Sequence, residues 1–241
     1  MSTLMIACAT LLLELCTASA QADTVPLPDN LTGFSTHDGE VYFGESDAHE
    51  AYFPLASNFL TQKTQSYCGV ASMVMVLNAL GLPAPAVPEY APYRTFTQDN
   101  VLSERTDAIL PRETLAHQGM TLDQLGGILA TQPVKAEVHH AADSSVEDFR
   151  KLASAYLGEP GHFVLVNYLR TALGEQTGGH ISPLAAYDAK ADRFLILDVA
   201  RYKYPPVWVK TADMFAAMNT PDAVNDNKSR GFVLVTAAAV Q

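Results

Sequence analysis

Residues 61–73 read TQKTQSYCGVASM and open an apolar run that continues to Leu80. From Cys68 onward the run, CGVASMVMVLNAL, is apolar on every face apart from one serine and one asparagine. A helix that is apolar all round is a buried one, and Gly81, which follows it, is a typical helix terminator. The stretch therefore predicts a buried central helix with a cysteine at its N-terminus. Cys68 is then a small buried hydrophobe, half of a disulfide, a metal ligand or a nucleophile.

The composition describes an ordinary soluble globular protein. Of the 241 residues, 48% are hydrophobic and 17% are charged, which are proportions typical of chains that fold around a core. The 26 acidic and 15 basic residues give a formal charge of -11, and no Lys/Arg-rich run interrupts it. Such a surface disfavours nucleic acid and anionic membranes as partners. The length accommodates one large domain or two small ones.

The first twenty residues, MSTLMIACATLLLELCTASA, have a different character. An apolar run ends in Ala18-Ser19-Ala20, a small-x-small pattern typical of signal-peptide cleavage, and a polar stretch follows. No Lys or Arg precedes the run, Glu14 interrupts it, and it is too short for a transmembrane helix. We predict export to the periplasm with cleavage near Ala20. The alternative is a frayed N-terminal helix on a cytoplasmic protein.

Export changes the cysteine count. Cys8 and Cys16 lie in the segment that would be removed, so the mature chain, residues 21–241, keeps Cys68 alone. A single thiol has no intramolecular disulfide partner and forms no Cys-rich metal site. We predict no metal site and no cofactor. A reactive thiol and a buried inert cysteine remain as the two alternatives.

The pattern of the mature chain, residues 21–241, predicts a single domain with an α+β fold. Thr121 with Gln124, and Ser144 with Glu147, have the spacing of a capping box and mark two helix starts. Runs rich in apolar and β-branched residues predict strands at 41–43, 162–169, 180–187, 193–199 and 231–236, with a hairpin turn at 188–192. A helical N-terminal lobe with a buried helix, packed on a mostly antiparallel sheet, is an α+β arrangement.

Three further residues give Cys68 the setting of a nucleophile. A helix N-terminus stabilises a thiolate with its unpaired N–H groups, and the thiolate needs a base that a third group orients. His180, one of seven histidines, follows two glycines and opens a predicted strand. Asp198 lies in the apolar run FLILDV, where a carboxylate needs a partner, and the predicted hairpin would place it beside His180. Gln62, six residues before Cys68, could help the Cys68 backbone N–H to hold an oxyanion.

The order Cys68, His180, Asp198 along the chain, with a glutamine before the cysteine, is that of papain-like cysteine enzymes. More specifically, the sequence resembles phytochelatin synthases of the short bacterial kind. The resemblance rests on QSYCGVASMVMVLNALG, YRTFTQDNV, GMTLDQLG, HFVLVNYLR, GGHISPLAAYD, DRFLILDVARYKYPPVW and NKSRGF. It covers about residues 55–236, and it implies a papain-like fold, catalytic roles for these three residues and an oxyanion role for Gln62.

The resemblance also implies a substrate. Members of that family attack the Cys–Gly amide of glutathione, release glycine and form a γ-glutamylcysteinyl thioester. Another glutathione then accepts the acyl group, giving phytochelatins that chelate heavy metals, or water does. The chain ends at Gln241 without the Cys-rich second half of full-length synthases, so we expect water as the favoured acceptor. The expected partners are glutathione, heavy-metal ions carried as glutathione complexes, and a second copy of the chain in a homodimer.

Glutathione carries two carboxylates, so an acidic protein needs local cations to bind it. Arg201, three residues after Asp198, and Arg230, ahead of the last predicted strand, are the best-placed candidates. From the residues alone, two other functions stay open. One is a peptidase that uses the same three catalytic side chains. The other is a non-catalytic protein that binds metal with Cys68 and nearby histidines, although such a site needs several soft ligands and the mature chain has one thiolate.

Overall fold

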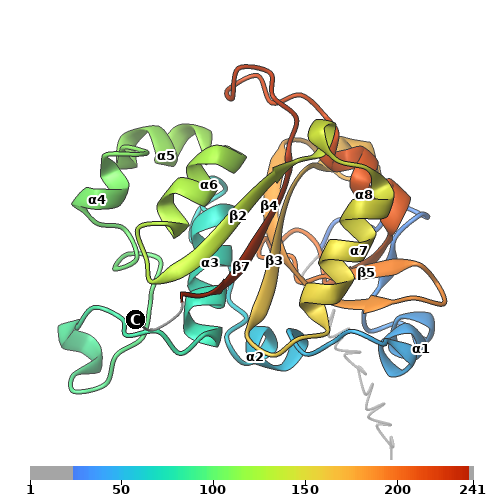
Figure 1. Ribbon diagram of the computed structural model, residues 1–241, viewed down its shortest axis with the longest axis horizontal. Coiled ribbons are helices and arrows are strands. Elements are labelled where there is room, and N and C mark those ends of the chain that lie inside the picture. Colours follow the sequence, from blue (N-terminus) through green and yellow to red (C-terminus); the bar gives the residue numbers. More distant parts are fainter. Residues whose placement is uncertain (1–23, 239–241) are drawn as a thin grey trace, which may run out of the picture.

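The structure is a computed structural model that describes residues 24–238. Its centre is a seven-stranded sheet with the order β1-β6-β5-β4-β3-β7-β2, in which every neighbouring pair is antiparallel (Figure 1). The strands are β1 (Thr32–Gly33), β2 (Val134–His140), β3 (His162–Leu169), β4 (Gly179–Asp188), β5 (Arg193–Ile196), β6 (Val207–Lys210) and β7 (Gly231–Ala237). The α+β class predicted from the sequence is confirmed.

Helices cover both faces of the middle of the sheet. The α-helices are α1 (His37–Glu45), α2 (Tyr52–Ser57), α3 (Cys68–Ala79), α4 (Glu104–Asp107), α5 (Arg112–Gln118), α6 (Leu122–Leu129), α7 (Val146–Leu157) and α8 (Thr211–Met218). Figure 1 shows α3 on one side of β3 and β4, and α7 and α8 on the other. Because both faces are covered, β3 and β4 are buried along almost their whole length, which explains their continuous apolar sequences.

Helix α3 is buried as its sequence predicts. Every residue from Cys68 to Leu77 is buried. Ser72 is polar but satisfied, since its hydroxyl lies 2.8 Å from the Cys68 carbonyl and 3.1 Å from that of Ile181. The second contact attaches the first turn of α3 to β4 beside His180. One buried hydroxyl therefore fixes the helix start against the strand that carries the histidine.

The β4–β5 hairpin places Asp198 next to His180. The predicted turn at 188–192 is present, and the Asp188 carboxylate accepts a hydrogen bond from the Lys190 backbone N–H at 2.9 Å. Leu184 pairs with Ile196, and the Leu197 N–H donates to the Pro183 carbonyl at 3.0 Å. Asp198 follows directly, and the strand ends there so that its side chain turns toward the start of β4.

Two local predictions are wrong. The strand predicted at 41–43 is part of α1, because Thr36 caps this helix by accepting from the Gly39 N–H at 3.2 Å. Gly39 also packs tightly: a Cβ there would lie 2.2 Å from the Gly33 carbonyl oxygen. The second error concerns α7, whose N-cap is Ser145 and not Ser144, with its hydroxyl accepting from the Asp148 N–H. The capping box of Thr121 and Gln124 at the start of α6 is confirmed.

Strands β2 and β6 had no predicted counterpart. The sequence of β2, VKAEVHH, alternates without a strong apolar run, and the strand is only partly buried. β6, VWVK, has only four residues, and it forms a strand because it pairs with β5 on one side and with β1 on the other. β2 is an edge strand of the sheet, and β6 lies next to the opposite edge.

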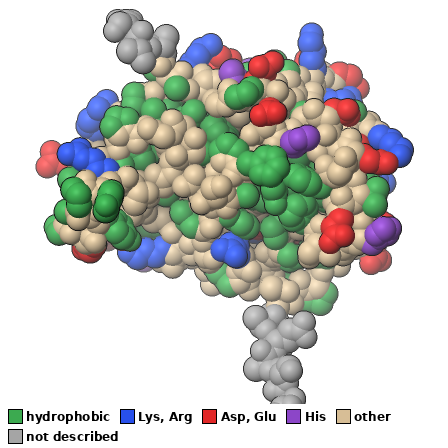
Figure 2. Space-filling model, turned by 90° about the horizontal axis from the view of Figure 1, so that it is seen from below, with side chains coloured by type: hydrophobic (Ala, Val, Ile, Leu, Met, Phe, Trp, Pro, Cys, Tyr) green, Lys and Arg blue, Asp and Glu red, His purple; other side chains and the backbone are tan. Residues whose placement is uncertain are grey.

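The predictions for residues 1–20, including Cys8 and Cys16, fall outside the described part of the chain. Within residues 24–238 no helix combines the length and the apolar character that a bilayer crossing requires. Figure 2 shows one face of the molecule, on which acidic and basic side chains lie singly or beside each other around a largely neutral and hydrophobic centre. On that face the described Lys and Arg side chains form no continuous basic field.

Candidate active site

Cys68 begins α3, and its thiol lies at a helix N-terminus beside His180. Burial raises the pKa of the Cys68 thiol, but the neighbouring His180 and the backbone N–H groups of Ile181 and Gly69 outweigh that effect, so the pKa is lowered overall. A helix start supplies unpaired N–H groups, which favour the anion. The site therefore stabilises a thiolate, the form in which cysteine is a nucleophile.

His180 is held by Asp198 through a short hydrogen bond. Its Nε2 lies 2.8 Å from Asp198 Oδ1 and 2.9 Å from the Ser182 hydroxyl. A carboxylate only accepts hydrogen bonds, so Nε2 carries the hydrogen and Nδ1 is the ring nitrogen left for Cys68. All of these side chains are buried. The hairpin thus fixes both the tautomer and the orientation of the histidine.

The charge of Asp198 sets the protonation of His180. Burial lowers the pKa of the imidazole, but the charge of Asp198 and the hydrogen bonds to Asp198 and Cys68 raise it above its usual value, against an opposing effect of Arg170. With the pKa of the thiol lowered and that of the imidazole raised, a thiolate–imidazolium pair is the favoured form. This is the resting state that a cysteine acyl-enzyme requires.

Arg170, which the sequence analysis did not identify, lies behind Asp198. Its Nη2 is 3.0 and 2.8 Å from the two Asp198 carboxylate oxygens, and its Nη1 is 2.5 Å from Glu175 Oε2. Although burial raises the pKa of Asp198, the charges and hydrogen bonds of His180 and Arg170 hold it well below its usual range. The guanidinium also lies 5.1 Å from the Tyr204 ring centroid. Asp198 is therefore a stable anion in a closed network.

The backbone brings Glu175 to Arg170. Arg170 opens a short 3-10 helix, Arg170–Leu173, directly after β3, and Gly174 ends it with a positive φ of 79°. This turn lets the Glu175 N–H donate to the Arg170 carbonyl at 3.1 Å. Burial raises the pKa of Glu175, and Arg170 opposes that rise. An arginine after an apolar strand carries no sequence signal for such a role, because the role depends on the β3–β4 pairing.

Gln62 lies beside this network and is buried, but its amide group is engaged. Its backbone N–H donates to the Val199 carbonyl at 2.8 Å, which positions the residue next to Asp198. Its Nε2 donates to the Thr64 carbonyl at 2.7 Å and to the Tyr202 hydroxyl at 3.0 Å, while its buried Oε1 has no partner. Both amide hydrogens are thus occupied here. To stabilise an oxyanion, Gln62 must release one of them.

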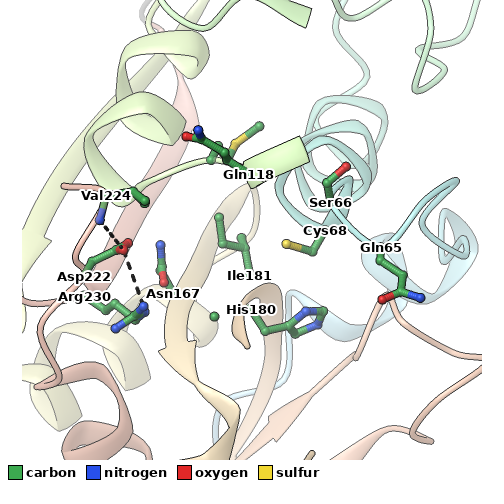
Figure 3. A pocket seen from close by; sticks show the side chains of 13 residues that line it. Gln65, Ser66, Cys68, Gln118, Asn167, His180, Ile181, Asp222, Val224 and Arg230 are labelled. Atoms are coloured by element: carbon green, nitrogen blue, oxygen red, sulfur yellow. Dashed lines mark hydrogen bonds and ion pairs between the residues drawn. The ribbon is translucent and has the colours of Figure 1, made fainter. Parts of the chain in front are cut away.

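A cavity of about 230 Å³ opens at Cys68 and His180 (Figure 3). Its lining residues come from the segment before α3, from the α5–α6 connection, from β3 and β4, and from the segment before β7: Gln65, Ser66, Cys68, Gln118, Gly119, Met120, Asn167, Gly179, His180, Ile181, Asp222, Val224 and Arg230. In Figure 3 the Cys68 thiol points toward the middle of this set, beside His180 and Ile181, and Asp222 with Arg230 lies on one side. The cavity therefore combines a nucleophile with a pair of opposite charges. We call it the donor pocket.

Arg230 is one of the two substrate-binding arginines predicted from the sequence, and it lines the donor pocket. It is 8% exposed. Its Nη1 donates to the Thr220 hydroxyl at 3.2 Å, its Nη2 is 3.5 Å from Asp222 Oδ1, and its buried Nε has no partner. A Cβ on Gly179 would lie 3.3 Å from that Nε. The absence of a side chain on Gly179 therefore leaves room for the guanidinium beside the start of β4, and its Nη1 also donates to the Pro221 carbonyl at 2.5 Å.

Arg201, the other predicted substrate-binding arginine, does not line the cavity at Cys68. It is exposed, and its guanidinium lies 4.6 Å from the Phe59 ring centroid. The chain turns sharply after Asp198, with the Lys203 N–H donating to the Ala200 carbonyl at 2.7 Å. Proximity to Asp198 in sequence therefore does not bring Arg201 to the site.

A second, larger cavity of about 520 Å³ lies on the other side of His180. Gln62, Gln65, Arg170, Gln176, Thr177, Gly178, Gly179, His180, Ala200, Tyr202 and Lys203 line it. The ammonium of Lys203 is 3.4 Å from the Gln176 carbonyl, and burial lowers its pKa. We call this cavity the acceptor pocket. Over the described range, residues 24–238, no group of three or more His, Cys, Asp or Glu side chains is arranged to hold a metal ion.

The antiparallel α+β fold, with a thiol at the start of a buried helix and a histidine held by a buried aspartate, defines a papain-like thiol enzyme. The chain belongs to the phytochelatin synthase family, whose model matches residues 22–232. Glutathione gamma-glutamylcysteinyltransferase 1 of Arabidopsis thaliana is 32% identical over 222 residues, covering 91% of this chain and 44% of that protein. The family resemblance predicted from the sequence is confirmed.

Two further relatives bear the same kind of name. Glutathione gamma-glutamylcysteinyltransferase 1 of Lotus japonicus is 34% identical over 84% of this chain and 40% of its own length. The glutathione gamma-glutamylcysteinyltransferase of Schizosaccharomyces pombe is 27% identical over 77% of this chain and 43% of its own. The chain thus spans less than half the length of these curated relatives.

Proposed function

We propose that the protein cleaves the Cys–Gly amide of glutathione through a thioester on Cys68. The observation that carries this proposal is the donor pocket, which joins a thiol of lowered pKa to the buried charges of Asp222 and Arg230. The family of the chain and the names of its relatives support the same reaction.

The side chains supply each proton transfer of the acylation step. The Cys68 thiolate attacks the cysteinyl carbonyl carbon of glutathione, and the negative charge moves to the carbonyl oxygen. The backbone N–H of Cys68 and the amide of Gln62 are the proposed donors to that oxyanion. His180, as imidazolium, gives its proton to the departing glycine amine. The C–N bond breaks, glycine leaves, and γ-glutamylcysteine remains bound to Cys68 as a thioester.

Deacylation reverses these roles. Neutral His180 takes a proton from the incoming acceptor, the acceptor attacks the thioester carbonyl, and the sulfur leaves as a thiolate. Asp198 stays ionised throughout, because Arg170 and His180 both stabilise its charge. With water as acceptor the product is γ-glutamylcysteine. With the amine of a second glutathione as acceptor, the product is a phytochelatin.

The opposite charges on one side of the donor pocket fit the γ-glutamyl group. A γ-linked glutamate keeps both its α-amino and its α-carboxyl group free, so it is a zwitterion. We propose that the Arg230 guanidinium, which lines the donor pocket, binds the carboxylate and that Asp222 binds the ammonium. Charge-assisted hydrogen bonds of this kind contribute about 1.5–3 kcal/mol. Such recognition predicts a preference for γ-linked substrates over ordinary peptides.

We propose water as the dominant acceptor. A competing amine must be bound and oriented to gain the effective concentration that defeats the solvent. A second glutathione would bring two more carboxylates, whereas the acceptor pocket offers Lys203 and an Arg170 that is already bonded to two carboxylates. We propose that heavy-metal ions reach the site only as complexes with glutathione, which are part of the substrate. Export to the periplasm is proposed from residues 1–20 alone, and N-terminal sequencing of the secreted protein tests it.

Mass spectrometry of the protein after incubation with glutathione tests the main proposal. We expect a γ-glutamylcysteinyl adduct on the peptide that contains Cys68, together with free glycine. The Cys68→Ser variant should show neither while keeping the thermal unfolding temperature of the wild type. The matched control substrate is α-glutamyl-cysteinyl-glycine, which should not be cleaved. An adduct on another residue, or equal cleavage of the α-linked peptide, would contradict the proposal.

A further inference from the structure

The chain segment that carries Asp222 and Arg230 is held from outside the donor pocket by a second cluster of charged side chains. This cluster consists of Asp123 at the start of α6, His140 at the end of β2, and Lys228. Asp123 accepts from His140 Nε2 at 2.8 Å through one oxygen and from Lys228 Nζ at 2.7 Å through the other. None of the three lines the donor pocket.

Of the three side chains in the cluster, His140 makes the contact nearest in sequence to Arg230. Its Nδ1 lies 2.6 Å from the carbonyl oxygen of Ser229, the residue before Arg230. Two backbone bonds continue the attachment, since the Ala142 N–H donates to the Ser229 hydroxyl at 2.9 Å and the Ala141 N–H to the Arg230 carbonyl at 2.9 Å. Each residue from Lys228 to Arg230 is therefore bonded to α6 or to the end of β2. These contacts fix the backbone from which the Arg230 side chain extends.

The two partners of the His140 ring both accept hydrogen bonds. A backbone carbonyl and a carboxylate have no hydrogen to donate, so both ring nitrogens must carry one. A neutral imidazole has a single N–H and satisfies only one of these partners. A ring that carries a hydrogen on each nitrogen satisfies both. The pKa of Asp123 is itself lowered, because Lys228 and His140 together outweigh the effect of burial.

We propose that His140, Asp123 and Lys228 form a positioning cluster that fixes Arg230 in the donor pocket and thereby sets the affinity for the glutamyl end of the substrate. The proposal rests on the proposed function of the donor pocket. It assigns no chemical step to the cluster, whose side chains act only through the segment 219–230. It goes beyond that function by naming residues outside the pocket that control binding.

Amide substitutions at His140 separate its two hydrogen bonds. His140→Asn keeps a donor near the position of Nδ1, facing Ser229, and loses the contact to Asp123. His140→Gln keeps a donor near the position of Nε2, facing Asp123, and loses the contact to Ser229. His140→Ala loses both. His162→Ala is the matched control, because the His162 Nδ1 also bonds a backbone carbonyl, that of Pro160 at 3.1 Å, at an exposed site away from the pocket.

Steady-state kinetics of glycine release from glutathione give the first readout. One hydrogen bond of about 0.5–1.5 kcal/mol corresponds to a change of roughly 2- to 10-fold. We expect His140→Ala and His140→Gln to raise KM by such a factor, with kcat changed by less than about twofold. His140→Asn should stay nearer to the wild type. A KM unchanged in His140→Ala, or raised equally in His162→Ala, overturns the proposal.

Hydrogen exchange separates failure of this proposal from failure of the proposed function. In the substrate-free protein at about pH 6, the backbone amides of residues 219–230 should exchange at least threefold faster in His140→Ala than in His162→Ala. This result needs no activity. A wild type that releases no glycine would contradict the proposed function and leave the exchange experiment valid. Equal exchange in the two variants overturns the positioning role even if glutathione is cleaved.

Discussion

Arg170 binds Asp198 through both carboxylate oxygens, with Nη2 at 3.0 and 2.8 Å. The aspartate that orients His180 therefore lies between two cations, and its charge is shared between them. Asp198 raises the pKa of His180 while Arg170 lowers it. In the proposed reaction, this balance lets the imidazole hold a proton beside the thiolate and donate it to the leaving amine. Arg170 thus takes part in setting the protonation of the site without touching the thiol.

Arg170→Met should destabilise the protein, because it leaves the buried Glu175 carboxylate unpaired and leaves Asp198 with His180 as its only charged partner. Breaking a buried pair from one side costs about 3–5 kcal/mol. Arg170→Met combined with Glu175→Gln should recover part of that loss, since the orphaned Glu175 charge is removed. Urea unfolding at neutral pH measures both effects. If Arg170→Met unfolds at the wild-type midpoint, the network does not contribute to the stability of the fold.

Asp198→Asn should move the alkaline limb of the activity profile to lower pH. The Asp198 charge raises the pKa of His180 against burial and Arg170, so an uncharged amide lets that pKa fall. A histidine of lower pKa loses its proton earlier as the pH rises, and the thiolate–imidazolium pair is then lost earlier too. The amide oxygen still accepts from Nε2, so we expect a smaller loss of activity than in His180→Ala. A kcat/KM profile across the neutral range checks this prediction.

The acidic limb serves as the control in that experiment. It reports the thiol of Cys68, whose pKa His180 lowers. In Asp198→Asn the His180 imidazole is less readily protonated and therefore stabilises the thiolate less. The acidic limb should then stay in place or move to higher pH, and the pH range of activity should narrow. A profile displaced as a whole toward higher pH would contradict the assigned role of Asp198.

The sequence predicts those site residues whose position follows from local structure. Cys68 opens an apolar helix. A hairpin turn of four residues, 189–192, joins β4, which carries His180, to β5, which ends two residues before Asp198, so local patterns are sufficient to bring His180 and Asp198 together. Arg170 reaches Asp198 only through the β3–β4 pairing. No local pattern carries that information, which is why the sequence did not reveal it.

Arg201 and Gln62 show that nearness in sequence is not sufficient to predict a role in the site. Arg201 follows Asp198 by three residues, which predicts that it binds substrate, yet the turn after Asp198 directs its side chain onto Phe59. Gln62 was selected by its spacing to Cys68, and it does lie beside the network. Its amide nevertheless bonds Tyr202, 140 residues away in sequence. Spacing predicts which residues are near the site, and long-range contacts decide what their side chains can do there.

Arg230→Ala should raise KM for glutathione by about 10- to 100-fold, the factor expected for a charge-assisted contact of about 1.5–3 kcal/mol. Its guanidinium is buried and has an unpartnered Nε in the donor pocket. Arg201→Ala is the matched control, and it should leave KM within about twofold, because an exposed cation contributes little. Steady-state glycine release measures both variants. Equal losses in the two would mean that the donor pocket is not where the substrate carboxylate binds.

Glutathione cleavage should proceed in the presence of a metal chelator at the rate measured without it. The proposed chemistry uses the Cys68 thiolate, the His180 proton and backbone N–H donors, each of which the chain supplies. Glycine release is measured in excess chelator and then after titration with cadmium. The comparison is made at constant free glutathione, because cadmium complexes glutathione and lowers its free concentration. An absolute metal requirement, restored by titration, would show that a metal takes part in the reaction.

Lys203→Ala should change the products without changing the first step. Lys203 lines the acceptor pocket and is absent from the donor pocket, so glycine release at low glutathione should stay within about twofold of the wild type. A second glutathione held by the Lys203 ammonium would compete with water for the thioester. Removal of that ammonium should therefore lower the fraction of phytochelatin among the products, a fraction that we expect to be minor already in the wild type. Lys190→Ala is the control, because that ammonium bonds Glu45 at 2.9 Å on an exposed hairpin turn. Mass spectrometry of the products over a range of glutathione concentrations measures the ratio. If the wild type makes mostly phytochelatin at low glutathione and Lys203→Ala makes mostly γ-glutamylcysteine, then the acceptor pocket binds a second substrate well, and water is not the dominant acceptor.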